Sequence, residues 1–157
     1  MSRIDELLQE MTLDEKISML AGANLWHSVA APRLGIPQFK VTEGPNGARG
    51  AWGDTGPQSV ATPVGIALGA TWNPDLIEKV GNVLADEVQA KGAHILLAPT
   101  VNLHRTPIAG RNFECFSEDP FLNCMIATAY IKGIQDKGAG ACTKHFVAND
   151  QDMSVTP

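Results

Sequence analysis

Two long segments of the chain, residues 73–91 and 120–137, carry apolar residues at helical spacing. An N-cap residue followed by proline opens each segment and a glycine follows it: Asn73-Pro74 and Gly92 for the first, Asp119-Pro120 and Gly138 for the second. The pattern therefore predicts two helices with one buried face each. The side chains expected on these faces are Leu76, Ile77, Val80, Val83, Leu84 and Val88 in the first helix, and Met125, Ile126, Ala129, Tyr130 and Ile134 in the second.

Two shorter helices are predicted near the start of the chain. Residues 3–10 have apolar residues on one face, and Thr12 and Glu15 have the spacing of a capping box that opens a second helix. We expect the apolar face of this second helix to point inward. It consists of Leu13, Ile17 and Leu20.

Three short runs with strand character flank the long helices. Residues 38–42 alternate, residues 94–98 are almost continuously apolar, and residues 140–146 follow the second long helix directly. The order strand, helix, strand, helix, strand predicts an α/β fold with a parallel sheet and right-handed crossovers. Residues 1–37 are then a helical lead-in, and residues 38–157 hold the first βα units. Open α/β sheets and (β/α)8 barrels share this pattern.

Polar and charged residues follow each predicted strand. Glu43 comes directly after the first strand, and Arg111 lies in the long loop after the second. Lys144 and His145 lie at the end of the third strand. The carboxyl ends of parallel strands form the ligand-binding edge of α/β folds, so we expect a binding site there. No Gly-x-Gly-x-x-Gly motif follows the first strand, which argues against a dinucleotide.

Composition and charge narrow the class of protein. With 157 residues, 44% of them hydrophobic and 18% charged, the chain can form a globular domain. The net charge of −5 and the scattered Lys and Arg residues argue against nucleic-acid binding. No apolar run approaches the ~20 residues of a membrane span. The charged first residues do not resemble a signal peptide, so we expect a cytoplasmic protein.

Neither the cysteines nor the histidines have the spacing of metal ligands, so we expect no metal site and no cofactor. We expect His104 to be a hydrogen-bonding residue of its loop, and Glu114 and Glu118 to pair with a nearby Arg or with backbone amides. The residues excluded as metal ligands are Cys115, Cys124, Cys142, His27, His94, His104 and His145.

Four segments resemble glycoside hydrolase family 3, the family of many β-glucosidases. Residues 42–49, Thr-Glu-Gly-Pro-Asn-Gly-Ala-Arg, resemble the family's Asp-Gly-Pro-Asn-Gly-x-Arg segment. Residues 67–73 resemble the next block, and residues 97–120 include a Gly-Arg-Asn-Phe-Glu block similar to the family's. Residues 144–150, which begin Lys-His-Phe, resemble the glucosidase and xylosidase branch of the family rather than the N-acetylglucosaminidase branch.

The resemblance implies a fold and a set of sugar contacts. The fold would be the N-terminal portion of a (β/α)8 TIM-type barrel, incomplete in this chain. The substrate would be a β-glucoside or oligosaccharide, bound at its non-reducing end by Glu43, Arg111, Lys144 and His145. The family usually has Asp in place of Glu43, and this difference bears on the sugar preference.

By the same resemblance, the full-length protein would hydrolyse terminal non-reducing β-D-glucosyl residues by a retaining mechanism. The nucleophile and the acid/base are then expected beyond Pro157, and this chain would be a truncated family 3 barrel domain, inactive alone. The full-length form could be a homo-oligomer. Three alternatives stay open: a non-catalytic carbohydrate-binding remnant or pseudoenzyme, a β-xylosidase of the same family, and an unrelated α/β module that binds an anionic metabolite through Arg111 and Lys144.

Overall fold

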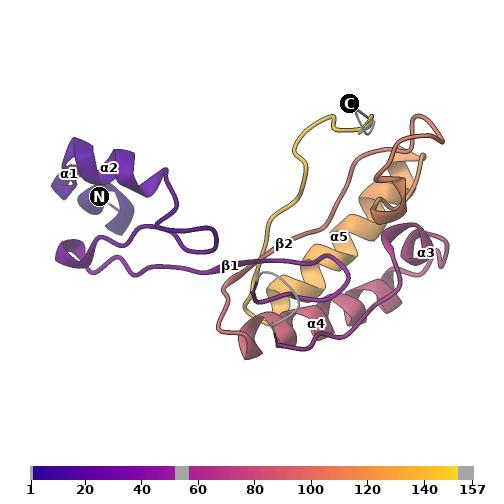
Figure 1. The fold of residues 1–157 in the computed structure, drawn as a ribbon, viewed down its shortest axis with the longest axis horizontal. Helices are drawn as coiled ribbons and strands as arrows, with labels where there is room; N and C mark the ends of the chain where they lie inside the picture. Colours follow the sequence, from indigo (N-terminus) through magenta and orange to yellow (C-terminus); the bar gives the residue numbers. More distant parts are fainter. Residues whose placement is uncertain (1, 52–56, 152–157) are drawn as a thin grey trace. The chain divides into compact units, whose positions relative to one another are not determined.

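The computed structural model describes residues 2–51 and 57–151. The chain forms two compact units, Met1–Val41 and Thr42–Pro157 (Figure 1). Within the described residues, no helix is both long and apolar enough to cross a membrane.

The first unit holds two short helices and a 3-10 turn. Helix α1 spans Arg3–Glu10, helix α2 spans Leu13–Met19, and the turn η1 spans Pro32–Leu34. The predicted capping box is confirmed: the Thr12 hydroxyl accepts from the Glu15 amide at 3.2 Å, and the Glu15 carboxylate accepts from the Thr12 amide at 2.9 Å.

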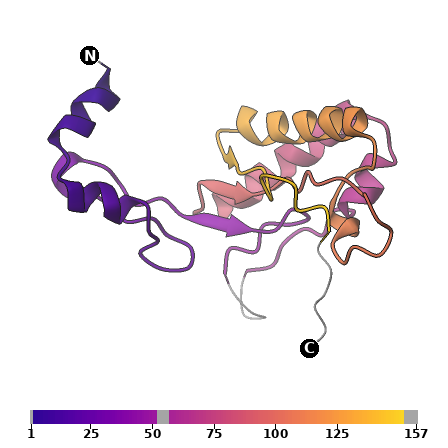
Figure 2. The same cartoon turned by 90° about the horizontal axis from the view of Figure 1, so that it is seen from above.

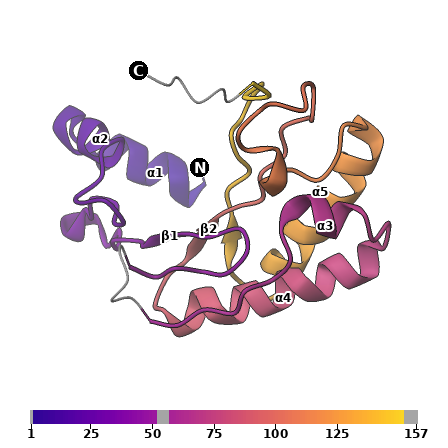
Figure 3. The ribbon, with the colours of Figure 1, turned by 45° about the vertical axis from the view of Figure 1, so that its right-hand side comes forward.

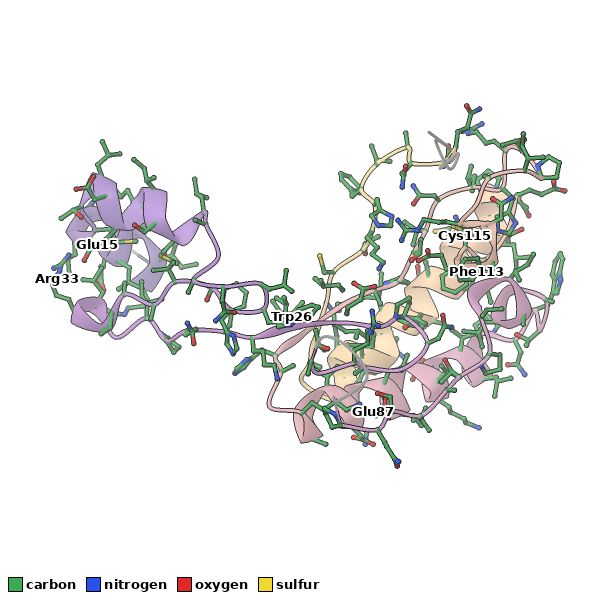
Figure 4. The ribbon with its side chains drawn as sticks, in the orientation of Figure 1. Glu15, Trp26, Arg33, Glu87, Phe113 and Cys115 are labelled. Carbon is green, nitrogen blue, oxygen red and sulfur yellow. The ribbon has the colours of Figure 1, made fainter. Side chains whose placement is uncertain are left out.

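An ion pair fixes the start of α2 to the turn η1. Arg33 contacts the Glu15 carboxylate at 2.7 Å, and Figure 4 shows the two side chains together. The Arg33 hydrogen bond is the main reason why the pKa of Glu15 is lowered to about 2. This carboxylate therefore stays ionised and serves both as cap and as ion-pair partner.

The expectation that the apolar face of α2 points inward is wrong for this chain. Leu13, Ile17 and Leu20 are 71%, 57% and 91% exposed. The helical spacing is as predicted, but the described residues supply no apolar surface that covers this face.

The second unit contains an α/β layer. Strands β1 (Val41–Glu43), β2 (Ile95–Leu97) and β3 (Gly140–Ala141) form a sheet in the order β1-β2-β3, and β1 contributes its last two residues to this unit. Strands β2 and β3 are parallel, which confirms the predicted α/β fold. Figures 1 and 2 show helices α4 (Pro74–Ala90) and α5 (Pro120–Asp136) side by side on one face of the sheet. Two shorter helical segments, α3 (Gly65–Gly69) and η2 (Asn112–Glu114), lie in the connections.

The strands are shorter than the sequence indicates. The first begins at Val41 and includes Glu43, and the third has ladder pairing only at Gly140–Ala141. Pairing between the second and third strands then resumes as a single parallel bridge between Thr100 and Lys144. Pro99 lies between β2 and this bridge and has no N–H to donate, so the regular ladder is interrupted there.

The predicted ends of the long helices are confirmed. The Asn73 side chain accepts from the Leu76 amide at 3.1 Å, and the Asp119 carboxylate accepts from the Phe121 amide at 3.0 Å. At the other ends, Gly92 and Gly138 have φ angles of 62° and 83°. Glycine adopts this left-handed conformation without the steric cost that other residues meet.

The buried faces of α4 and α5 are narrower than predicted. Leu76, Val83 and Met125 were expected to be buried but are 43%, 44% and 43% exposed. Two glycines on the facing sides bring the helix backbones close together: a Cβ on Gly133 would lie 2.1 Å from the Glu78 carbonyl oxygen, and one on Gly81 would lie 2.6 Å from the Tyr130 carbonyl oxygen. The predicted residues that are buried in the core are Ile77, Leu84, Val88, Ile126, Ala129, Tyr130 and Ile134, with Val80 partly buried.

Replacement of Gly133 by alanine should destabilise the protein. The added methyl group must push α4 away, and this overpacking exceeds the gain in helix propensity, for a net loss of about 1–2 kcal/mol. Chemical denaturation of the full-length protein measures the change. Thr128→Ala on the exposed side of the same helix is the control, and equal stability of both variants would show that the close approach is not limiting.

Candidate functional site

Polar side chains gather where the chain leaves the three strands. Glu43 is the last residue of β1, Thr100 lies just beyond β2, and Lys144 lies just beyond β3. The segments that leave β2 and β3 run beside each other away from the sheet (Figures 1 and 3). The bridge between Thr100 and Lys144 holds these two segments together.

Glu43 and Lys144 form an ion pair across the sheet. The Lys144 ammonium donates to a Glu43 carboxylate oxygen at 2.5 Å, although the two residues are 101 positions apart in sequence. Their side chains are 28% and 13% exposed. The pair is thus accessible on the Glu43 side while the lysine is mostly enclosed.

Arg111 is held by a buried carboxylate, Glu114. The Arg111 Nε donates to one Glu114 oxygen at 2.5 Å, and the Thr100 hydroxyl donates to the other at 2.8 Å. The predicted pairing of Glu114 with a nearby Arg is therefore confirmed. Burial tends to raise the pKa of Glu114, but the hydrogen bonds from Arg111 and Thr100 and the charges of Arg111 and Lys144 outweigh it and leave that pKa below its ordinary value.

His145 is fixed through its backbone. Its amide donates to the Asn102 side-chain oxygen at 3.0 Å, and the Asn102 amide group donates back to the His145 carbonyl at 3.4 Å. Among the described residues its buried Nδ1 has no hydrogen-bond partner. Burial, together with the charges of Arg111 and Lys144, lowers the pKa of His145. The ring is therefore biased to the neutral form, in which one nitrogen donates and the other accepts.

An open cleft of about 440 Å³ lies beside Glu43, Arg111 and Glu114, and Lys144 and His145 are not among the described residues that line it. Glu43 and Arg111 both line it, and Phe113, which is 53% exposed, adds an aromatic side chain. Arg111 and His145 also line a smaller adjoining pocket. The structure thus brings the four predicted site residues to one region. The cleft is lined by Glu43, Gly44, Pro45, Asn46, Gly47, Arg49, Ser59, Val60, Ala61, Arg111, Phe113 and Glu114.

The loop that carries Arg111 is tied down by residues away from the cleft. The His104 Nε2 lies 2.8 Å from the Asn112 carbonyl oxygen, which confirms His104 as a hydrogen-bonding residue of this loop. The Asp150 carboxylate accepts from the Leu103 amide at 2.9 Å and from Arg105 at 2.6 Å. The hydrogen bond from Arg105 is the main reason why the pKa of Asp150 is lowered.

Sequence reasoning missed Thr100, Asn102 and Asp150 as supports of the site. Each acts through a hydrogen bond to a residue that is distant in sequence, up to 47 positions away for Asp150. The only local signal is that Thr100 is the first polar residue after the apolar run at residues 95–99.

The arrangement suits recognition of hydroxyl groups. The Glu43 carboxylate can accept hydrogen bonds from hydroxyls, while Lys144 and Arg111 can donate to hydroxyl oxygens. Both oxygens of Glu114 already accept hydrogen bonds, so this carboxylate acts as an anchor for Arg111. Within residues 2–51 and 57–151, no cluster of three or more His, Cys, Asp and Glu side chains could hold a metal ion.

Comparison with known proteins gives consistent matches. The model of the glycosyl hydrolase family 3 N-terminal domain matches residues 11–154. The chain is 54% identical over 151 residues to a β-glucosidase of Rhizobium radiobacter, covering 96% of this chain and 18% of that protein. A probable β-glucosidase J of Neosartorya fischeri is 51% identical, with 95% of this chain and 17% of that protein covered.

Similar solved structures are also β-glucosidases. β-Glucosidase 3B from Thermotoga neapolitana in complex with glucose has a TM-score of 0.88 at 38% identity, over 96% of this chain and 24% of that one. β-Glucosidase from Kluyveromyces marxianus in complex with glucose has a TM-score of 0.91 at 45% identity, over 94% of this chain and 18% of that one. The chain thus spans about a fifth of the length of the proteins that it matches.

Proposed function

The chain belongs to glycosyl hydrolase family 3, and from this premise we propose that it forms part of a β-glucosidase-like enzyme that hydrolyses terminal non-reducing β-D-glucosyl residues. In this proposal the chain supplies part of the subsite that binds the terminal sugar. The observation that carries it is the ion pair between Glu43 and Lys144 beside the cleft that Arg111 lines. Relatives named β-glucosidase, two of them solved with glucose, support the choice of sugar.

A pyranose presents adjacent hydroxyls that both donate and accept hydrogen bonds. In the proposal Glu43 accepts from two neighbouring hydroxyls, and Lys144 and Arg111 donate to hydroxyl oxygens. His145, biased to its neutral form, offers one donor and one acceptor. A fixed set of donors and acceptors rejects an epimer because the wrong configuration leaves a buried polar group unpaired.

We propose that residues 1–157 are the N-terminal part of a barrel domain and that catalysis needs further residues. A retaining glycosidase uses two carboxylates about 5–5.5 Å apart, and a whole (β/α)8 barrel takes about 250 residues. Among the described residues, two carboxylates line the cleft, and one of them, Glu114, is occupied by Arg111 and Thr100. As the resemblance to the family implies, the nucleophile and the acid/base are assigned to positions beyond Pro157, and this part of the protein is expected to be inactive alone.

The test is hydrolysis of aryl β-D-glucosides and aryl β-D-xylosides by the full-length protein. We expect a higher kcat/KM for the glucoside, and NMR should show the β-anomer of glucose as the first product because two displacements retain the configuration. Faster hydrolysis of the xyloside would indicate a xylosidase. Glucose binding without hydrolysis would indicate a carbohydrate-binding pseudoenzyme, and competition by phosphate esters but not by glucose would overturn the sugar site.

A further inference from the structure

The segment between β1 and α3 forms one wall of the cleft from two stretches of backbone. The inner limb, residues 44–50, follows Glu43, and the outer limb, residues 57–63, leads to α3. Asn46 and Gly47 of the inner limb and Ser59 and Val60 of the outer limb line the cleft. The shape of this wall therefore depends on how the two limbs are held against each other.

The two limbs touch through their backbones. A Cβ on Gly47 would lie 2.0 Å from the Val60 carbonyl oxygen, so only glycine permits this approach. The Thr62 amide donates to the Asn46 carbonyl at 2.8 Å, and the Asn46 side chain donates to the Pro63 carbonyl at 2.7 Å. These contacts join the limbs at the end near α3.

At the other end, Glu87 of α4 and Lys91, the residue that directly follows this helix, hold both limbs. The Glu87 carboxylate accepts from the Ala48 amide at 3.0 Å with one oxygen and from the Val60 amide at 2.5 Å with the other. One helical turn later, the Lys91 ammonium donates to the Ala48 carbonyl and, at 2.5 Å, to the Ser59 hydroxyl. Glu87 is 17% exposed and Lys91 only 6%. Figure 4 shows Glu87 on α4.

The inner limb in turn fixes the backbone around Glu43, one of the proposed sugar-binding residues. The Arg49 amide donates to the Glu43 carbonyl at 2.8 Å, and the Gly50 amide donates to the Thr42 hydroxyl at 2.8 Å. A shift of Ala48 would therefore move the residues that immobilise Glu43. Binding sites of this kind tolerate displacements of only about 0.5 Å.

We propose that Glu87 is a positioning residue for the sugar site and that Lys91 assists it. The Glu87 carboxylate joins one amide from each limb, and so it sets both the wall of the cleft and the placement of Glu43. This inference rests on the proposed function, because it takes the cleft to be the glucoside site. Glu87 does not touch the substrate and acts only through the two limbs.

The variant Glu87→Gln in the full-length protein tests the proposal. Glutamine has the same length but offers one acceptor oxygen, and its NH₂ group would face the second backbone amide, donor against donor. We expect the KM for an aryl β-glucoside and the inhibition constant of glucose both to rise by about tenfold, the effect of losing one hydrogen bond to a charged group. The change in kcat should be smaller. Asp86→Asn is the control, because exposed Asp86 is adjacent in α4 and pairs with Lys137.

A merely structural role predicts a different result. Glu87→Gln would then lower Tm while leaving both constants unchanged, and this would overturn the proposal. If the variant does not fold, hydrogen exchange of the wild-type protein decides: glucose should slow exchange of the Ala48 and Val60 amides, and unchanged rates would overturn it. Failure of the wild-type protein to bind or hydrolyse glucosides would refute the proposed function itself. A Glu87→Gln variant that matches an active wild type would refute only the role proposed for Glu87.

Discussion

Replacement of Glu114 by glutamine is expected to destabilise the full-length protein by about 2–3 kcal/mol, because hydrogen bonds to a buried charged group are among the stronger ones. The Glu114 carboxylate accepts from both Arg111 and Thr100. Glutamine can accept only one of these bonds and turns a donor toward the other partner. Since Arg111 also lines the cleft, we expect kcat/KM for a β-glucoside to fall by about tenfold.

The destabilisation should depend on pH in a defined direction. The pKa of Glu114 is lower in the folded protein than the ordinary value of 4.5 for a glutamate side chain. The stability that its charge contributes is therefore fully present above about pH 4.5 and is lost as the pH falls through the folded pKa. Denaturation of the wild type and of Glu114→Gln across pH 3–7 measures this, and the difference should shrink toward acid.

The control for this experiment is Glu118→Gln in the same loop. Glu118 is exposed, and we expect its replacement to change stability by less than about 0.5 kcal/mol. A constant difference between the wild type and Glu114→Gln across the whole pH range would contradict the role given to the Glu114 charge.

Local signals in the sequence predicted the helices well. The caps at Thr12, Asn73 and Asp119 and the glycine stops all depend on groups within a few residues of each other, so their chemistry can be read directly from the chain. The exposed face of α2 marks the limit of such reasoning. Helical spacing establishes that Leu13, Ile17 and Leu20 share a face, but it does not identify what covers that face.

The pattern of residue types along the chain did not predict the contacts between residues that are distant in sequence. The parallel α/β order placed Glu43 and Lys144 at one edge of the sheet, but the pairing of these two side chains joins positions 101 apart. The role of Glu87 could not be predicted from the sequence for a related reason. In the sequence Glu87 is an ordinary charged residue of a helix, and its two partners are backbone amides 39 and 27 positions away. Backbone groups carry no sequence signature, so no pattern of residue types reveals such a contact.

Replacement of Lys144 by methionine should produce the largest loss of activity. The variant keeps most of the side-chain length but removes the ammonium that contacts Glu43 at 2.5 Å and, in the proposed site, donates to the sugar. Loss of one member of an enclosed hydrogen-bonded charge pair costs about 2–5 kcal/mol, so we expect kcat/KM for a β-glucoside to fall by about 100-fold or more. Steady-state kinetics of the full-length protein and calorimetric binding of glucose measure the loss.

A lysine-to-methionine substitution away from the proposed site provides a matched control. Lys132 pairs with Glu78 on the exposed surface of α4 and α5, at 3.0 Å, and Lys132→Met should leave kcat/KM unchanged because exposed ion pairs contribute about 0–1 kcal/mol. Because Glu43 and Lys144 orient each other, Glu43→Gln should add little to the loss already caused by Lys144→Met. Additive losses in the double variant would mean that each side chain contacts the sugar independently, and that their ion pair does not organise the site.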